Sequence, residues 1–203
     1  MSISQEEAGR VETAIREAQA RSSGRIVCVL ARASSTYEML PLFWSALVAL
    51  VAPWPLLAFT EISAEHIYLV QLFAFVVALA GLSMAWLRPA LTPAAIRRAN
   101  AHRAALEQFA LRGVAHGDER TGVLIYVSLA EHYARIIADE GAAKVIHQRE
   151  WQMIVDRLLS DMRDGVTAEA LIGAAARCGD LLSRHFPPRD GAALPSLHCL
   201  HVI

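Results

Sequence analysis

Two apolar runs constrain the fold of this chain more than any other feature of its sequence. They extend over residues 40–59 and 67–87, and neither contains an Asp, Glu, Lys or Arg. A helix of about 20 residues is long enough to cross about 30 Å of hydrocarbon. The sequence therefore predicts a transmembrane hairpin, surrounded by the lipid bilayer, with spans at about residues 40–59 and 67–87. Pro53 and Pro55 predict a kink near residues 52–54 of the first span.

The alternative to a membrane hairpin is a pair of core helices in a soluble domain. The composition argues against it, because 55% of the 203 residues are hydrophobic, only 19% are charged and the mean hydropathy is +0.34. This balance is more apolar than that of an average soluble domain. The excess lies between residues 39 and 87, and the composition of the remainder is ordinary.

Basic residues near the ends of the apolar runs predict the orientation. The loop at residues 60–66 has two Glu and no Lys or Arg, whereas arginines flank the hairpin on both sides at positions 25, 32, 88, 97, 98 and 103. The positive-inside rule therefore places the N- and C-termini in the cytoplasm. No secretory signal opens the sequence, and three cysteines without framework spacing are expected to be reduced thiols. The expected location is the inner, cytoplasmic membrane of a bacterium, as a protein with two spans.

The segments on either side of the hairpin predict helices and strands. Residues 1–38 begin with Ser4-x-x-Glu7, a capping-box pattern that predicts a helix, and continue with Ile26–Ala31, an apolar run typical of a buried strand. Residues 89–188 contain five predicted elements. They are a helix from Thr92-Pro93 to about Arg112, strands at 122–129 and 132–138 that form a β-hairpin, and helices at 149–163 and 167–185.

Neither segment can bury a core alone, because the first has one helix and one strand. Together they predict a single α/β domain with a small three- to four-stranded sheet covered by helices, interrupted in sequence by the hairpin at residues 39–88. The strand at Ile26–Ala31 is expected beside the one at 122–129. Residues 189–203 are expected to be a solvated, partly ordered tail.

Several of these segments carry a resemblance to a known family. Ser23-Gly-Arg-Ile-Val-Cys-Val-Leu30, the stretch from Thr121 to Gly141, and Trp151 at the start of a helix pair resemble the TPM domain, a phosphatase-like family of thylakoid-lumen and bacterial membrane proteins. The inserted hairpin is similar to a bacterial subgroup. The resemblance implies an α/β sandwich; weak acid phosphatase activity and divalent-metal binding are attributed to some members, and assembly or repair of membrane complexes to others.

The sequence departs from the family at its strand-turn-strand. The family has two acidic residues followed by an Arg, where this chain has Ala130, Glu131 and His132, while Arg135 falls at a basic position of the second strand. The candidate catalytic residues are therefore Glu131, His132 and Arg135. No positioned nucleophile and base can be identified among them, which favours a protein that is not an enzyme.

Three carboxylates are candidate metal ligands. Glu131, Asp139 and Glu140 offer oxygen donors of the type that Mg²⁺ or Ca²⁺ prefers. A calcium site needs six to eight oxygens, and no dense acidic loop supplies them. The interpretation without a functional role, in which all three are solvated loop residues, is favoured. The sequence therefore identifies no cofactor. If these carboxylates bind a metal, Ca²⁺ or Mg²⁺ is the expected ion.

The cysteines and the histidines near the C-terminus do not form a recognisable site. His198-Cys199-Leu-His201, with His185 upstream, lacks the four donors in paired spacing of a structural zinc site. Cys28 and Cys178 are expected to be small core residues. A net charge of −1 also lacks the basic footprint of a nucleic-acid-binding protein.

These observations lead to one predicted function and two alternatives. The predicted function is an integral inner-membrane protein whose cytoplasmic TPM-like domain serves in interaction or assembly, with a membrane protein or a second copy of the chain as partner. The first alternative is a divalent-metal-dependent phosphomonoester hydrolase that uses the carboxylates around Glu131. The second is a subunit of a small membrane transporter.

Overall fold

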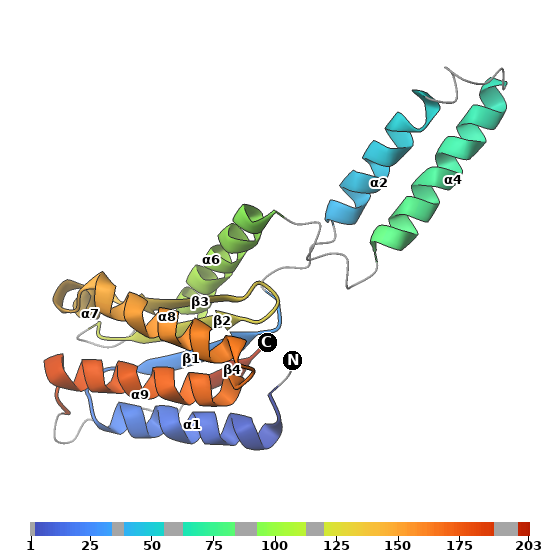
Figure 1. Cartoon of the computed structure of the whole chain (residues 1–203). Helices are drawn as coiled ribbons and strands as arrows, with labels where there is room; N and C mark the ends of the chain where they lie inside the picture. Colours follow the sequence, from blue (N-terminus) through green and yellow to red (C-terminus); the bar gives the residue numbers. More distant parts are fainter. Residues whose placement is uncertain (1–2, 34–38, 55–62, 84–92, 113–119, 189–198) are drawn as a thin grey trace. The chain divides into compact units, whose positions relative to one another are not determined.

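The chain divides into two units, one of residues 1–34 with 98–203 and one of residues 35–97. The structure is a computed structural model that describes residues 3–33, 39–54, 63–83, 93–112, 120–188 and 199–203. Figure 1 shows the first unit as a sheet with helices on it and the second as a pair of helices.

A four-stranded mixed sheet organises the described part of the first unit, in the order β3-β2-β1-β4. The strands are β1 (Ile26–Ala31), β2 (Val123–Ser128), β3 (Tyr133–Ala138) and β4 (Leu200–Val202). β1 is parallel to β2 and β4, and β2 is antiparallel to β3. The predicted pairing of Ile26–Ala31 with the strand after Gly122 is confirmed, with Ile26 opposite Val123.

The two central strands are apolar along their whole length because both faces of the sheet are covered. All six residues of β1 and all six of β2 are buried. β3 lies at the edge and alternates, with Ala134 and Ile136 buried and its other residues half-buried. β3, predicted at 132–138, begins at Tyr133, one residue later than predicted, because His132 belongs to the turn.

Helices α1, α8 and α9 cover one face of the sheet, and the short helix α7 follows β3. Their bounds are α1 (Gln5–Ala20), α7 (Glu140–Val145), α8 (Gln148–Arg163) and α9 (Thr167–His185). The predicted capping box is present, because the backbone N–H of Glu7 donates to Ser4 Oγ and that of Ser4 donates to the Glu7 carboxylate. In α8 the buried residues recur at helical spacing, at Trp151, Ile154, Val155 and Leu158.

Helix α6 (Ala94–Leu111) covers the opposite face of the sheet. There Ala105 is buried among residues of the central strands: Val27, Val29, Ala31, Leu124 and Tyr126. Phe109 of α6 and Tyr133 of β3 pack against this cluster. The first unit therefore has three layers, with α6 on one side and three long helices on the other.

The prediction of a solvated tail is wrong for residues 199–203, because this segment contains β4, which pairs with β1. The N–H of Cys28 donates to the carbonyl of Cys199 (2.7 Å), and the N–H of Ile203 donates to that of Leu30 (3.0 Å). A three-residue strand has almost no local signal, since its stability comes from a partner about 170 residues earlier. Residues 189–198 lie outside the described residues.

The second unit contains α2 (Met39–Val51) and α4 (Ala64–Leu82), which run side by side in opposite directions (Figure 1). One face of α2 is buried at three positions four residues apart, Pro41, Ser45 and Ala49. Helix α2 ends at Val51, directly before the residues where a kink is predicted. The far ends of both predicted spans fall partly in residues 55–62 and 84–92, outside the described residues.

Within the described residues, one helical segment is long and apolar enough to cross a membrane. It is Glu65–Leu82, 18 residues with a mean hydropathy of 1.7. The other apolar helical segment, Pro41–Val51, is shorter.

Candidate functional site

The β2–β3 hairpin separates the predicted carboxylates instead of gathering them. Glu131 lies in the turn at one end of the hairpin, and Asp139 and Glu140 lie beyond the other end. Five steps of register separate the pair Ser128–Tyr133 from the pair Val123–Ala138, which is about 17 Å along the strands. Glu131 therefore cannot share a metal ion with Asp139 and Glu140, since metal–oxygen bonds are about 2.0–2.6 Å long.

Glu131 is a buried residue of the turn, so the expectation of a solvated side chain is wrong for it. Its exposed fraction is 9%. Ser128 Oγ donates a hydrogen bond to Glu131 Oε2, and the N–H of His132 donates to the carbonyl of Leu129 (3.3 Å). The first bond ties the carboxylate to the end of β2, and the second closes the backbone turn. Glu131 consequently stabilises the hairpin turn.

Asp139 and Glu140 take part in an ion-pair cluster at the start of α7. Asp139 is 4% exposed, which also corrects the expectation of a solvated loop residue, whereas Glu140 is exposed. Asp139 Oδ1 accepts from the N–H of Glu140 (2.7 Å) and lies 3.3 Å from Arg120 Nη2. Arg120 and Lys144 both pair with Glu140. The hydrogen bond from Lys144, followed by the charges of Lys144 and Arg120, lowers the pKa of Glu140.

This cluster is already neutralised by its own cations. Among the described residues, no three His, Cys, Asp or Glu side chains are grouped so that they could hold a metal ion. The arrangement instead caps α7 and ties it to the segment before β2, because the N–H of Gly141 also donates to the carbonyl of Arg120 (2.9 Å).

His132 and Arg135 do come together, in a cavity of about 390 Å³ at the exposed edge of β3. We call it the β3-edge cavity. Its lining is drawn from α6, β3 with the turn before it, and α8. The lining residues are Arg98, His132, Tyr133, Ala134, Arg135, Ile136, Gln148, Trp151, Gln152, Val155, Leu159 and Arg163. Glu131 is not among them.

The alternation of β3 explains how one strand can line a cavity that reaches both faces of the sheet. Ala134 and Ile136 belong to the core cluster beneath α8, together with Trp151 and Val155. Arg135 lies opposite Tyr126, whose side chain belongs to the cluster beneath α6. The cavity thus extends around the sheet edge, with an apolar wall on the α8 side and Arg135 on the α6 side.

His132 enters the cavity from a backbone conformation that favours glycine. Its φ is 48°, in the left-handed region that L-residues seldom adopt. The side chain is exposed at the start of the edge strand. His132 lies outside β3, and among the described residues no ion pair joins it to Glu131, whose Oε2 accepts from Ser128.

The charged side chains that line the β3-edge cavity are all cationic. Arg98, Arg135 and Arg163 line it, with no Asp or Glu among the lining residues. Across the residues that the structure describes, none of these three guanidinium groups forms an ion pair with a carboxylate. Guanidinium groups match the planar geometry of carboxylate and phosphate oxyanions. The cavity therefore has the charge and the donors for an anion.

Sequence reasoning found only part of this lining. It selected His132 and Arg135, interpreted Arg98 as a membrane-flanking residue, and gave Arg163 no role. The cavity joins residues up to 65 positions apart, from Arg98 to Arg163. No local spacing marks such a set, so only the packing of α6 and α8 around β3 could reveal it.

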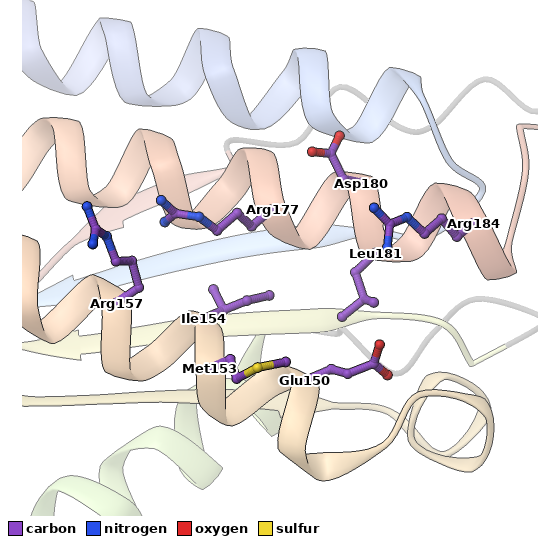
Figure 2. Close-up of a pocket in the computed structure, with 8 residues that line it drawn as sticks. All are labelled: Glu150, Met153, Ile154, Arg157, Arg177, Asp180, Leu181 and Arg184. Carbon is purple, nitrogen blue, oxygen red and sulfur yellow. The ribbon is translucent and has the colours of Figure 1, made fainter.

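A second hollow lies between α8 and α9, with a volume of about 360 Å³ (Figure 2). Met153, Ile154 and Leu181 form its apolar part, with charged side chains of both signs around them in Figure 2. Two of these charges have partners, since Asp180 pairs with Arg21 (2.6 Å) and Arg157 with Asp161 (3.0 Å). The mixture of signs gives this hollow no clear ligand preference.

The remaining predicted residues near the C-terminus have structural contacts. Cys199 Sγ donates to Gln19 Oε1 (3.2 Å), and His201 Nδ1 lies 3.0 Å from Arg112 Nη1. His185 is exposed at the end of α9, and His198 lies outside the described residues. Cys28 and Cys178 are buried, as predicted.

The fold of the first unit and its β2–β3 hairpin define an α/β domain of a known class. The family model described as the TPM domain matches residues 91–181, which include α6, the β2–β3 hairpin, α8 and most of α9. Over these residues the chain is similar to the TPM domain. Among solved structures, the chain is similar to the NMR structure of the BA42 protein from the psychrophilic bacterium Bizionia argentinensis, with a TM-score of 0.62 and 15% identity, over 100% of this chain and 97% of that one. At this identity the likeness shows the fold alone. No curated protein matches the sequence.

Proposed function

We propose that the chain is an integral protein of a bacterial inner membrane whose TPM domain is a cytoplasmic interaction or assembly module. The observation that carries the proposal is the apolar surface of the second unit. In the segment Glu65–Leu82 only 6% of the residues are buried. Phe73 is 71% exposed and Tyr68 is 65% exposed. A water-soluble helix hides such side chains on one face.

A bilayer accounts for this surface energetically. Burial of one large apolar side chain is worth about 1.5–3 kcal/mol, so the exposed apolar side chains of α2 and α4 carry a large cost in water. With 19 residues, α4 is about 28 Å long, close to the hydrocarbon thickness of a membrane. The small residues Ser45 and Ala49 on the buried face of α2 allow close helix packing of the kind found in membranes.

The site geometry favours binding over metal-dependent hydrolysis. The phosphatase alternative needs carboxylates that converge on a metal ion, but Glu131 and Asp139 lie beyond opposite ends of a strand pair that is about 17 Å long. The β3-edge cavity offers cations and an apolar wall instead. The partner of the module is proposed to be a membrane protein or a second copy of the chain.

Membrane topology provides the primary test. Ser63→Cys, before α4, and Ser160→Cys, on the exposed side of α8, each introduce one accessible thiol. The three native cysteines are buried and react slowly. A membrane-impermeant maleimide should label Ser63→Cys in whole cells and Ser160→Cys only after lysis. Recovery of the protein in the aqueous fraction without detergent would overturn the proposal.

Two further measurements address the module itself. Purification of the full chain in mild detergent should return a defined partner or an oligomer, and a monomer without partner would count against an assembly role. Phenyl phosphate should not be hydrolysed in Mg²⁺ or Ca²⁺. Turnover that disappears in Glu131→Gln would favour the phosphatase alternative.

A further inference from the structure

We propose that the β3-edge cavity binds a small organic anion, with a phosphate or carboxylate group held by Arg98, Arg135 and Arg163 and an apolar body placed against the α8 wall. The inference concerns binding alone and does not depend on where the protein is located. It rests on three observations: the unpaired cations, a buried donor without acceptor, and the form of the cavity.

The first observation is the gathering of unpaired positive charge. Some other arginines of this domain pair with carboxylates, such as Arg10 with Glu169 and Arg21 with Asp180. Arg98, Arg135 and Arg163, with His132, instead line one cavity without an acidic residue among its lining. Like charges around a shared space repel one another, and an anion between them converts that repulsion into charge-assisted hydrogen bonds.

The second observation is Trp151. Its side chain lines the cavity, is only 2% exposed, and belongs to the core beneath α8. The Nε1–H group is buried, and no described residue accepts a hydrogen bond from it. Buried indole N–H groups usually have an acceptor, and leaving a donor unsatisfied is costly. Trp151 thus places an indole donor without a described acceptor in the residue that forms part of the cavity wall.

The third observation is the form of the cavity. A volume of about 390 Å³ lies in the range of small-molecule sites. Ala134, Ile136, Val155 and Leu159 make one wall apolar. Gln148 and Gln152, one helical turn apart on α8, add amide donors. This combination suits an amphipathic anion better than a bare inorganic ion.

Simpler roles exist for two of the arginines. A charged residue on an edge strand, such as Arg135, prevents pairing with another chain. Arg163, in the last turn of α8, interacts favourably with the helix dipole. Neither role explains why both residues share a cavity with Arg98. Binding of an anion accounts for the three cations together.

The test uses the full chain in a nonionic detergent and phenyl phosphate as the probe. Phenol is the uncharged counterpart, and inorganic phosphate lacks the apolar body. Calorimetry measures affinity, and the indole N–H resonances of the four tryptophans report the contact. Trp151→Phe assigns the relevant resonance. We expect saturable binding of phenyl phosphate, weaker binding of inorganic phosphate, none of phenol, and a selective shift of the Trp151 signal.

Matched variants separate the cavity from general charge. Arg135→Gln and Arg163→Gln each remove one cavity cation and should weaken binding about tenfold or more. Arg149→Gln removes the same charge from an exposed position of α8 outside the cavity, and its effect should be less than about twofold. Circular dichroism establishes that each variant is folded, and either cavity variant suffices if the other does not fold.

Competition with bicelles that contain an anionic phospholipid identifies the source of the anion. Displacement of phenyl phosphate would support a lipid headgroup in the cavity, and its absence would support a soluble anion. The proposal is overturned if phenyl phosphate does not bind, if the Trp151 resonance does not move, or if Arg149→Gln weakens binding as much as Arg135→Gln. A protein found in the aqueous fraction that still binds phenyl phosphate would refute the proposed membrane location and leave the anion site intact.

Discussion

Replacement of Gly179 by alanine is expected to destabilise the domain, although alanine is the better helix former. Gly179 lies in α9, which packs against α1. A Cβ atom added there would lie 2.7 Å from Ala18 Cβ and 3.0 Å from both Cα and the carbonyl oxygen of Ala18. Ordinary carbon–carbon contacts are about 3.5–4.0 Å. The two helices would therefore have to separate by several tenths of an ångström.

Two opposing terms set the magnitude. A Gly→Ala change within a helix gains about 1 kcal/mol in propensity. Overpacking in a close-packed interior costs about 1–3 kcal/mol. The cost should lie in the upper part of that range, because two of the three contacted atoms are backbone atoms that cannot rotate away. We expect a net loss of about 1–2 kcal/mol in the free energy of unfolding.

Gly9→Ala is the matched control, since Gly9 lies in α1 with nothing within 4 Å of its added Cβ atom. It should stabilise the protein by up to about 1 kcal/mol. Urea unfolding of both full-length variants, followed by circular dichroism in mild detergent, measures the difference. If Gly179→Ala is as stabilising as Gly9→Ala, α1 and α9 do not approach as closely as described, and the reasoning fails.

Three further predictions concern caps, core and thiols. Ser4→Ala removes the capping box of α1 and should lower the free energy of unfolding by about 1 kcal/mol, measured by urea titration. Leu158→Ala opens a cavity beneath α8 and should cost about 2–5 kcal/mol in the same assay, and a loss below 1 kcal/mol would contradict its full burial. Burial raises the pKa of Cys28 from 9.0 to about 12 and also raises that of Cys178. These thiols should resist a thiol-specific reagent until the protein unfolds, and their contribution to stability should be complete below pH 9 and lost as the pH rises toward 12.

The sequence predicted the elements of the sheet where local chemistry determines them. Ile26–Ala31 and the strand after Gly122 are continuous apolar runs because both faces of the sheet are covered, and the observed burial of β1 and β2 follows that logic. The capping box at Ser4 and Glu7 was readable for the same reason, since its partners are three residues apart.

What the sequence did not predict depends on contacts between distant residues. The strand at Leu200–Val202 forms because one edge of β1 is available for pairing. The local sequence of these three residues does not indicate that distant partner. The burial of Glu131 and Asp139 was missed because polar residues in turns are normally solvated, whereas these two make local hydrogen bonds. The β3-edge cavity escaped notice because three elements contribute its cations.

The place of the apolar helices within the connection from β1 to β2 has a consequence for biosynthesis. β1 leaves the ribosome before α2 and α4, but both of its neighbours, β2 and β4, are made after them. β1 must therefore remain unpaired while the apolar helices α2 and α4 are translated and reach their final environment. Pairing between such distant segments is slow, because long loops must close first. The sheet can therefore be completed only after α2 and α4 have been synthesised.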